Sequence, residues 1–475
     1  MIKKVIIYTL LMFGCLSILT SCEDWFDVSP KVEIKEDDLF KDEDGYFDAL
    51  VGVYSIMASE NLYGKNMTMG FMDALVQNYY ITSAAHPFYY ASKYDYTHNA
   101  SQTIIDKFWE KMYEAVVNTN NVLTRLEKAS KSMFSDDNYN LIKGEALALR
   151  AYLHFDLLRM FGPSFKMDKD RKCIPYVKTV SKENTPYSSP VEVVNACVAD
   201  LEKALTCLVN DPVKNSVQET DNIYLMNRKT RLNVYAVQGL LARVYMYGDN
   251  KGKALEYALK LVDNDSLPLT TNISGVRNDR VFSQELLFGL FVDKISTWAD
   301  DFFKSSSMGY DLQQLEYYLD LMYDKTAGLG NDVRYSELFD IADYYGKQKK
   351  YLQLSTDNYN AKYRVPMLRL SEIYYIAAEC TTDLGEAARW LNLVRKARNL
   401  EEKKFNSFSE VQAYLTAEYR REFYSEGQLF YRYKWLNASA IDYCTINIAD
   451  KLEQVYILPL PDQEKEFGGV ANGDN

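Results

Sequence analysis

The chain has 475 residues, of which 47% are hydrophobic and 25% charged, a composition typical of folded globular proteins. Its formal net charge is −12 at pH 7, and it contains no polybasic stretch. This balance argues against binding to nucleic acid and against electrostatic binding to anionic lipid.

The first 22 residues have the pattern of a bacterial lipoprotein signal. Lys3 and Lys4 precede an apolar run from Val5 to Leu19, which is shorter than the ~20 residues that a membrane-spanning helix needs. A small residue, Ser21, directly precedes Cys22, and this arrangement resembles a lipobox. We therefore predict cleavage before Cys22 and a covalent lipid on its sulfur. The alternative is an ordinary cleavable signal in which Cys22 has no special role.

An acidic segment, residues 23–45, follows, and we predict that it is extended. The stretch Asp42 to Gly45 is similar to the start of a calcium loop, but the glutamate expected at the twelfth position is missing. We interpret it as the entry to a helix over residues 46–59. No other metal pattern occurs, so the lipid is the only non-protein group that we predict, and bound calcium has no support.

Tyrosines crowd residues 77–98, where neither the helical nor the strand period organises them. We predict a loop between helices that could expose aromatic rings. The candidate ligand-binding residues of this first cluster are Asn78, Tyr79, Tyr80, Tyr89, Tyr90, Tyr96 and Asn99.

Helical periodicity is clear in several stretches of the chain. The pair within 232–263, joined at Gly248-Asp249-Asn250, has the small-residue spacing of tetratricopeptide hairpins. Because such pairs are scattered rather than tandem, we predict a helical scaffold with long insertions. The predicted helical stretches are 103–126, 140–162, 189–208, 232–263 and a second hairpin at 366–400.

Between residues 266 and 360 the helical signal weakens, which predicts surface loops and a few short strands. A second aromatic cluster, from Trp298 to Tyr318, lies here, and its candidate ligand-binding residues are Trp298 and Tyr310. We predict one body over residues 46–475, after a signal at 1–21 and a lipidated tether at 22–45. Its parts are a helical part (46–265), a loop-rich insertion (266–360) and a C-terminal helical part (361–475).

Charged side chains and cysteines on the predicted helices have structural explanations. We expect the arginines to form partly buried ion pairs that fix helix register. Of the seven cysteines, Cys15 leaves with the signal and Cys22 is lipidated, so an odd number remains. We expect buried free thiols, with one disulfide involving Cys173 or Cys444 as the alternative. The charged residues concerned are Arg150, Arg369, Arg395, Arg420, Arg421, Glu145, Glu372 and Glu422.

An ordered set of motifs resembles the SusD/RagB nutrient-uptake lipoproteins of Bacteroidetes. Each motif is loose alone, but together they follow the family's order along nearly the whole mature chain. The Ser164-Phe165-Lys166 that follows Gly162-Pro163 departs from the strand-like continuation expected there. Separately, Asp249 and Gly252 replace the residues more usual in the family. The motifs are the lipobox, Gly52-Val53-Tyr54, Gly144 to Arg159, Pro366 to Tyr374, Leu391 to Arg398, Arg420 to Trp435 and Pro459-Leu460-Pro461.

The resemblance implies an all-α, SusD-like fold with tetratricopeptide-like helix pairs and an irregular, loop-rich ligand face. It further implies a non-catalytic lipoprotein at the surface of the outer membrane, where Glu23 and Asp24 resemble an export signal. Its implied partners are an oligosaccharide ligand and a SusC-like TonB-dependent transporter. Peptide capture by the same architecture is the alternative.

The chemistry of the two aromatic clusters fits sugar binding, because sugar rings stack on tyrosine and tryptophan while nearby polar groups bond their hydroxyls. Two other function classes remain as hypotheses: a tetratricopeptide scaffold that binds protein, and a helical-barrel glycoside hydrolase. A hydrolase would need two carboxylates facing each other about 5–9.5 Å apart. The adjacent pairs Asp136-Asp137 and Asp300-Asp301 do not predict that arrangement, and no GxSxG, HExxH or Walker A motif occurs.

Overall fold

The computed structural model describes residues 36–215, 222–304, 310–325 and 331–468. The predicted signal and residues 22–35 of the tether, with Cys22, Glu23 and Asp24, lie outside the described residues. The prediction that residues 23–45 are extended is wrong for part of the described stretch, since Glu36–Leu39 form helix α2 and helix α3 begins at Glu43. The acidic stretch at Asp42 begins a helix, as predicted, because the Asp42 side chain accepts a hydrogen bond from the Gly45 backbone N–H at 3.1 Å.

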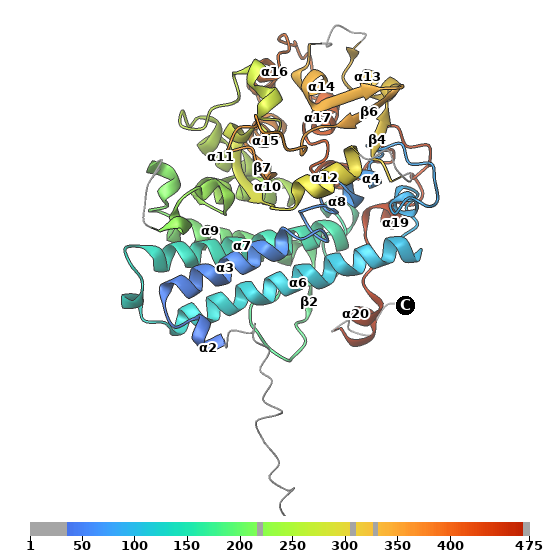
Figure 1. Cartoon of the computed structure of the whole chain (residues 1–475). Coiled ribbons are helices and arrows are strands. Elements are labelled where there is room, and N and C mark those ends of the chain that lie inside the picture. Colours follow the sequence, from blue (N-terminus) through green and yellow to red (C-terminus); the bar gives the residue numbers. More distant parts are fainter. Residues whose placement is uncertain (1–35, 216–221, 305–309, 326–330, 469–475) are drawn as a thin grey trace, which may run out of the picture.

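Long helices form the first half of the fold and lie side by side in the lower part of Figure 1. Neighbouring pairs along the chain pack on one another, α6 on α7, α7 on α9, and α10 on α11. Ser189 and Glu192 form a reciprocal capping box at the start of α9, with Pro190 at its first turn. The helices are α2 (Glu36–Leu39), α3 (Glu43–Met57), α4 (Phe71–Leu75), α5 (Tyr89–Ser92), α6 (Asn99–Lys128), α7 (Asn138–Phe161), α8 (Phe165–Asp168), α9 (Pro190–Cys207), α10 (Val234–Tyr247) and α11 (Lys251–Val262).

Shorter helices fill the second half and surround the sheets in the upper part of Figure 1. Helix α15 packs on both α11 and α16, so the two predicted hairpins are neighbours in space. The helices are α12 (Ile295–Phe303), α13 (Glu316–Met322), α14 (Val333–Leu338), α15 (Leu370–Cys380), α16 (Leu384–Ala397), α17 (Phe408–Glu422), α18 (Leu429–Leu436), α19 (Leu452–Tyr456) and α20 (Asp462–Phe467). The 3₁₀ turns are η2 (Lys131–Met133), η3 (Pro212–Asn215), η4 (Ile223–Leu225), η5 (Arg228–Thr230), η6 (Ile273–Asn278) and η7 (Ser283–Glu285).

Small antiparallel sheets interrupt the helices. Strands β1 (Ile174–Pro175) and β2 (Tyr187–Ser188) pair, and so do β3 (Leu286–Phe291) and β7 (Arg364–Arg369). The third sheet has the order β4-β6-β5, from β4 (Gln313–Leu315), β5 (Phe339–Ala342) and β6 (Tyr345–Gln348).

One predicted boundary is wrong. The second hairpin was expected to start at residue 366, but residues 364–369 form β7, and α15 begins only at Leu370. Pro366 has no N–H to offer a helix or a ladder, and it lies opposite Gly289 in a two-stranded sheet, where a missing donor is tolerated.

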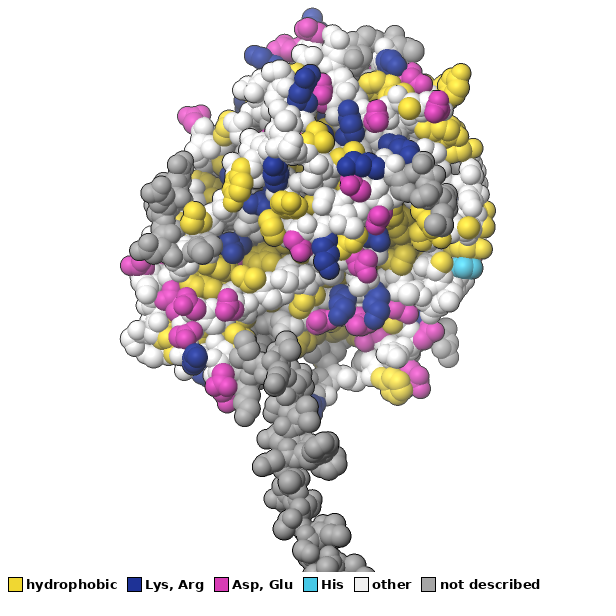
Figure 2. All heavy atoms as spheres, in the orientation of Figure 1, with side chains coloured by type: hydrophobic (Ala, Val, Ile, Leu, Met, Phe, Trp, Pro, Cys, Tyr) yellow, Lys and Arg dark blue, Asp and Glu magenta, His cyan; other side chains and the backbone are white. Residues whose placement is uncertain are grey.

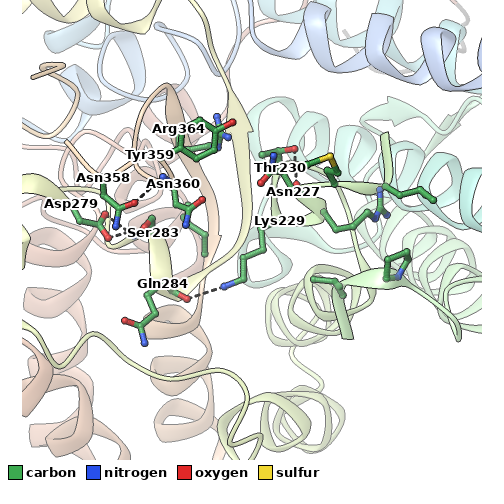
Figure 3. A pocket seen from close by; sticks show the side chains of 16 residues that line it. Asn227, Lys229, Thr230, Asp279, Ser283, Gln284, Asn358, Tyr359, Asn360 and Arg364 are labelled. Atoms are coloured by element: carbon green, nitrogen blue, oxygen red, sulfur yellow. Dashed lines mark hydrogen bonds between the residues drawn. The ribbon is translucent and has the colours of Figure 1, made fainter. Parts of the chain in front are cut away.

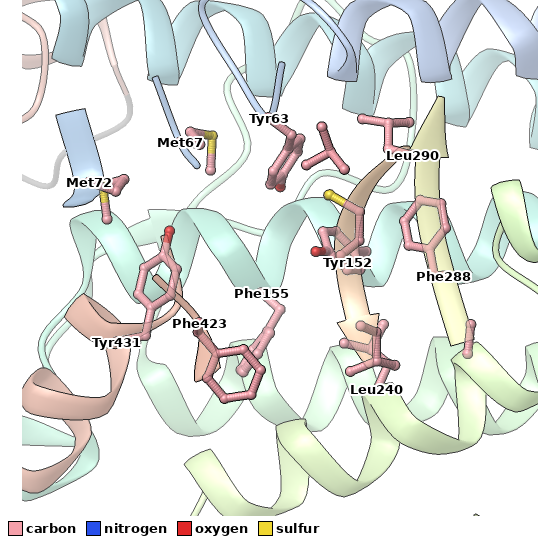
Figure 4. Close-up of a cluster of buried hydrophobic side chains, with 14 of the residues drawn as sticks. Tyr63, Met67, Met72, Tyr152, Phe155, Leu240, Phe288, Leu290, Phe423 and Tyr431 are labelled. Carbon is pink, nitrogen blue, oxygen red and sulfur yellow. The ribbon is translucent and has the colours of Figure 1, made fainter. Parts of the chain in front are cut away.

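The hydrophobic core runs between the two halves. Figure 4 shows Tyr63, Tyr152 and Phe288, which come from distant parts of the sequence, lying together inside it. The Tyr152 ring lies 5.8 Å from Tyr63 and 5.9 Å from Phe288, in edge-to-face geometry. The predicted C-terminal tail packs against this body, since Leu458 is buried and its N–H donates to the Met160 carbonyl at 3.0 Å.

Buried ion pairs join the elements of the second half. Glu422, the last residue of α17, accepts hydrogen bonds from Arg334, Arg369 and Arg398, which lie in or next to α14, β7 and α16. The surrounding buried network holds five cations and five carboxylates, and Arg421 also pairs with the half-exposed Asp324 at 2.9 Å. Its members are Lys350, Arg334, Arg369, Arg398, Arg421, Glu285, Asp332, Glu418, Glu422 and Glu426.

The expectation of buried ion pairing is confirmed for Arg369 and Arg421 and, in the first half, for Arg150, which binds Asp200 at 2.7 Å. It is wrong for Arg395 and Arg420. Arg395 donates to the Glu401 carbonyl and the Tyr414 hydroxyl, and Arg420 donates to the carbonyl of Val76 and the side-chain oxygen of Asn78. The expectation is also confirmed for Glu145 and Glu372, which form buried pairs with Arg228 and Arg243.

The cysteines of the described chain are free thiols, as expected. Cys173, Cys197 and Cys380 are buried, while Cys207 and Cys444 are partly exposed. Burial raises the pKa of the Cys173 and Cys380 thiols to about 12, which makes both of them poor nucleophiles.

Candidate functional site

The two aromatic clusters, far apart in the sequence, meet at the edge of the β4-β6-β5 sheet. The Tyr80 N–H donates to the Gln313 carbonyl at 2.8 Å, and the Gln314 amide donates to the Gln77 carbonyl at 2.9 Å. These bonds hold the segment after α4 alongside β4. The Tyr80 ring then lies 6.3 Å from the Tyr345 ring, with 37° between their planes. The structure therefore joins Tyr80 of the first cluster to β4, which lies within the second, and brings it close to Tyr345 of β6.

The turn between β5 and β6 presents a further tyrosine to solvent. Asp343 and Tyr344 have φ of 51° and 69°, and positive φ at both central residues is the requirement of a type I′ hairpin turn. The left-handed region costs a residue with a Cβ atom about 1–2 kcal/mol. The Tyr344 side chain is 82% exposed, so little packing offsets that cost. Backbone contacts hold the residue in this conformation instead, because the Glu316 N–H donates to the Tyr344 carbonyl and β5 pairs with β6 up to the turn.

A polar hollow of about 530 Å³ lies beside Tyr345. Its lining includes Lys304, at the end of α12, and Asp340, Asp343 and Lys347 on the β5–β6 hairpin. Lys347 donates to Asp311 at 2.6 Å, which fixes one cation at the wall. A tilted aromatic pair next to carboxylates, ammonium groups and amides offers both the flat apolar face and the hydrogen-bonding groups that a sugar requires. We call Tyr80, Tyr344, Tyr345 and the lining of this hollow the tyrosine platform.

Other exposed rings lie near the platform. Tyr310 is 45% exposed, and its ring is 6.3 Å from that of His86. Helix α13 begins where the Glu316 N–H donates to the Tyr344 carbonyl, and it carries the exposed Tyr317. Figure 2 shows hydrophobic side chains gathered along the upper right edge, where Figure 1 places β4 and β6.

Three residues of the first predicted cluster are buried instead. The Asn78 side chain donates to Asp73 at 2.8 Å. The Tyr79 hydroxyl donates to the Met69 carbonyl at 2.7 Å, and the Tyr96 hydroxyl donates to the Val455 carbonyl at 2.8 Å. In this structure their side chains hold the loop in place and are not available to a ligand.

Of the remaining candidates of that cluster, Tyr89 and Tyr90 begin α5 and Asn99 begins α6. Tyr89 and Tyr90 are half-buried, and the Tyr90 ring stacks on His98 with their centres 3.3 Å apart. Asn99 is exposed. None of the three lines the hollow beside Tyr345. The structure thus brings Tyr80 to the platform, places Tyr310 next to Asp311, which accepts from Lys347 of the platform, and leaves these three apart.

Trp298 lies on α12 but lines a different groove, together with Phe291. The far end of the same helix, at Phe303, borders the tyrosine platform. Sequence reasoning missed Tyr344 and Tyr345. The available signal was Asp343-Tyr344-Tyr345-Gly346, an aspartate-led turn between two short alternating runs.

Comparison with known proteins agrees with this architecture. One family model, described as "Starch-binding associating with outer membrane", matches residues 24–246, and the SusD family model matches residues 295–464. A SusD-like protein of Formosa agariphila is 19% identical over 61% of this chain and 51% of its own length. A SusD-like protein of Bacteroides ovatus is 25% identical over 34% of this chain and 28% of its own. The chain thus aligns with about half, or less, of these curated relatives.

Solved structures share the fold. A SusD superfamily protein from Bacteroides thetaiotaomicron aligns with a TM-score of 0.72 and 21% identity, over 90% of this chain and 98% of its own. A SusD-like carbohydrate binding protein from Bacteroides vulgatus aligns with a TM-score of 0.66 and 22% identity, over 83% and 84%. No helix within the described residues has the length and apolar character to span a membrane. With two family models covering most of its length and this helical fold, the chain belongs to the SusD/RagB family.

Proposed function

We propose that this protein is a non-catalytic, cell-surface lipoprotein that captures an oligosaccharide on the tyrosine platform. Cys22 would carry the lipid anchor, and a SusC-like TonB-dependent transporter of the outer membrane would receive the ligand. Family membership supports the general role, and the family model for residues 24–246 is described by starch binding and the outer membrane.

The observation that carries the ligand class is the pairing of Tyr80 with Tyr345 beside a polar hollow. Peptide ligands use pockets or exposed strand edges. The exposed Tyr80 ring and the half-buried Tyr345 ring, flanked by Asp340, Asp343 and Lys347, instead match the alternating apolar faces and hydroxyls of a sugar chain. A similar solved structure from Bacteroides vulgatus is described as carbohydrate binding.

Calorimetry of the purified protein against neutral glucan, mannan and xylan oligosaccharides tests the ligand. The Tyr345→Ala variant should weaken binding to the best of these by about tenfold, since it removes an aromatic stacking partner. Phe467→Ala is the matched control, because Phe467 is 68% exposed, lies on α20 and does not line the hollow. Tight binding of peptides with no oligosaccharide bound, or equal binding by Tyr345→Ala, would contradict the proposal.

Three further measurements test the remaining parts. Incubation with the bound oligosaccharide should release no shorter products, whereas hydrolysis would contradict a non-catalytic role. Metabolic labelling with a palmitate analogue should label the wild type and not Cys22→Ser. Affinity purification from native outer membranes should recover a TonB-dependent transporter in stoichiometric amount, and its absence would remove the proposed partner.

A further inference from the structure

A second groove lies away from the tyrosine platform. Two adjoining hollows of about 820 Å³ and about 970 Å³ share five lining residues, so they form one continuous groove between η4–η5, β3 and the start of β7. We call it the Arg364 groove. The shared residues are Met226, Asn227, Thr230, Tyr359 and Arg364. Figure 3 shows Arg364 and Tyr359 together on one wall, with Lys229 on the opposite side reaching toward Gln284.

Three cations of this groove have no carboxylate partner within the described chain. Arg364, only 8% exposed, donates to the Lys362 carbonyl and lies 5.1 Å from the Phe291 ring. Arg231 lies 4.0 Å from the Tyr224 ring, and Lys229 donates to the Gln284 carbonyl at 3.0 Å. In a protein with 66 acidic and 54 basic residues, three such cations in one groove are unexpected.

The carboxylates of the groove are directed elsewhere. Asp279 accepts hydrogen bonds from both the N–H and the hydroxyl of Ser283. Glu60 faces Lys65 at 3.6 Å. Asp293 is exposed and adjoins the exposed Lys294 at the rim. None of these three forms an ion pair with the arginines of the groove in the described structure.

The electrostatic state of the groove favours an incoming anion. Burial lowers the pKa of the Arg364 guanidinium. Tyr359 acts to raise this pKa, and the positive charge of Arg231 acts to lower it further. Burial also lowers the pKa of Lys229. A buried arginine elsewhere in the protein, such as Arg398, instead has its pKa raised, since Glu285 and Glu422 outweigh the effect of burial. The groove thus holds positive charge that a bound anion would stabilise.

Aromatic and amide groups surround these cations. Tyr359 is 70% exposed and Phe291 48% exposed, while Asn358 and Asn360 follow the same segment. We propose that the Arg364 groove binds an acidic oligosaccharide, with a carboxylate or sulfate between Arg231 and Arg364 and sugar rings packed on Tyr359. The inference rests on the proposed function only in taking the ligand to be a saccharide. It does not require the tyrosine platform.

The test compares charged and neutral ligands that are otherwise matched. Calorimetry of the full protein would use oligogalacturonate, its carboxyl-reduced neutral form, and a sulfated heparin tetrasaccharide. We expect an acidic ligand to bind at least tenfold more tightly than the neutral form, because charge-assisted hydrogen bonds are the strong ones. Affinity should fall as salt rises. The uronate and heparin arms distinguish a carboxylate-binding from a sulfate-binding groove.

Variants locate the binding. Arg231→Gln, at a half-buried position, and Tyr359→Ala should each weaken the acidic ligand by about tenfold. Arg389→Gln removes the same charge from an exposed pair on α16 and should change nothing. Tyr345→Ala should leave this affinity intact, so that failure of the platform and failure of the groove are separable. Binding of neither acidic ligand, equal binding of the neutral form, or no effect of Arg231→Gln would overturn the inference.

Discussion

Replacing Glu422 by glutamine preserves the size of the side chain but removes the negative charge that three arginines share. Arg334 Nη1 and Arg398 Nε donate to its Oε2 at 2.8 and 2.9 Å, and Arg369 donates to its Oε1. All four side chains are at most 1% exposed. The variant therefore leaves the buried network with one uncompensated positive charge.

Breaking a buried pair by removing one partner costs about 3–5 kcal/mol. For a chain of 475 residues the entropy of unfolding is about 1 kcal/mol/K, so the melting temperature should fall by about 3–5 °C. Differential scanning calorimetry measures this shift. Glu386→Gln is the matched control, because its pair with Arg389 is exposed, and we expect a shift below about 1 °C.

A double variant separates charge balance from shape. In Glu422→Gln with Arg369→Met, every remaining ion keeps a partner: Arg398 keeps Glu285, and Lys350 keeps Glu426. The double variant should therefore be more stable than the sum of the single effects. A Glu422→Gln shift no larger than that of the control, or strictly additive single effects, would refute the reasoning.

Four other predictions follow from single features. Burial acts to raise the pKa of Glu418, but Arg334 and Arg421 outweigh it and hold it at about 2, so the stability it contributes should be lost as pH falls from about 4.5 to about 2. Acid titration of Glu418→Gln should show a smaller loss than the wild type. Burial lowers the pKa of His154 to about 4, and His154 accepts the Val177 N–H, so stability should fall as pH drops from about 6.5 to about 4. Chemical denaturation of His154→Gln at pH values near 7 and near 5 should show a weaker pH dependence, and an unchanged one would contradict this assignment. Gly427→Ala should lower the melting temperature strongly or prevent folding, because φ is +69° and a Cβ would lie 1.9 Å from the Met67 carbonyl oxygen. Asp73→Asn should destabilise the loop that carries Tyr80, since Asp73 accepts the Ser425 and Gly427 N–H groups, and hydrogen exchange of residues 77–82 would measure it.

Local pattern determined much of the fold. The helices over 140–162, 189–208 and 232–263 match α7, α9 and the α10–α11 pair because their apolar residues recur at the helical period and their ends carry Gly, Pro or Ser signals. The strand β7 was missed because a short apolar run has no distinctive period. Its pairing with β3, far away in the sequence, decides its conformation.

The candidate site was only partly predictable for a related reason. Tyr79 and Tyr80 are neighbours of the same type, yet one is buried and the other 43% exposed. Tyr79 is the buried one because its hydroxyl forms hydrogen bonds with the Met69 carbonyl and the Ser425 hydroxyl. Neither contact can be predicted from the sequence pattern. Tyr345 joins the platform only because β6 pairs between β4 and β5. Tyrosines in such loops do not recur at a helical or strand period, so the sequence does not predict which of them are exposed.

The position of helix α12 affects how tightly the protein would retain a long ligand compared with a short one. Trp298 lines the Arg364 groove and Phe303 borders the hollow beside Tyr345, and the two residues are separated by about 8 Å of helix axis. A polymer long enough to bend around this helix would engage both surfaces, so its second contact would be intramolecular. Short flexible connections give effective concentrations in the millimolar range. Two individually weak contacts would then yield avid retention of long chains and rapid release of short ones.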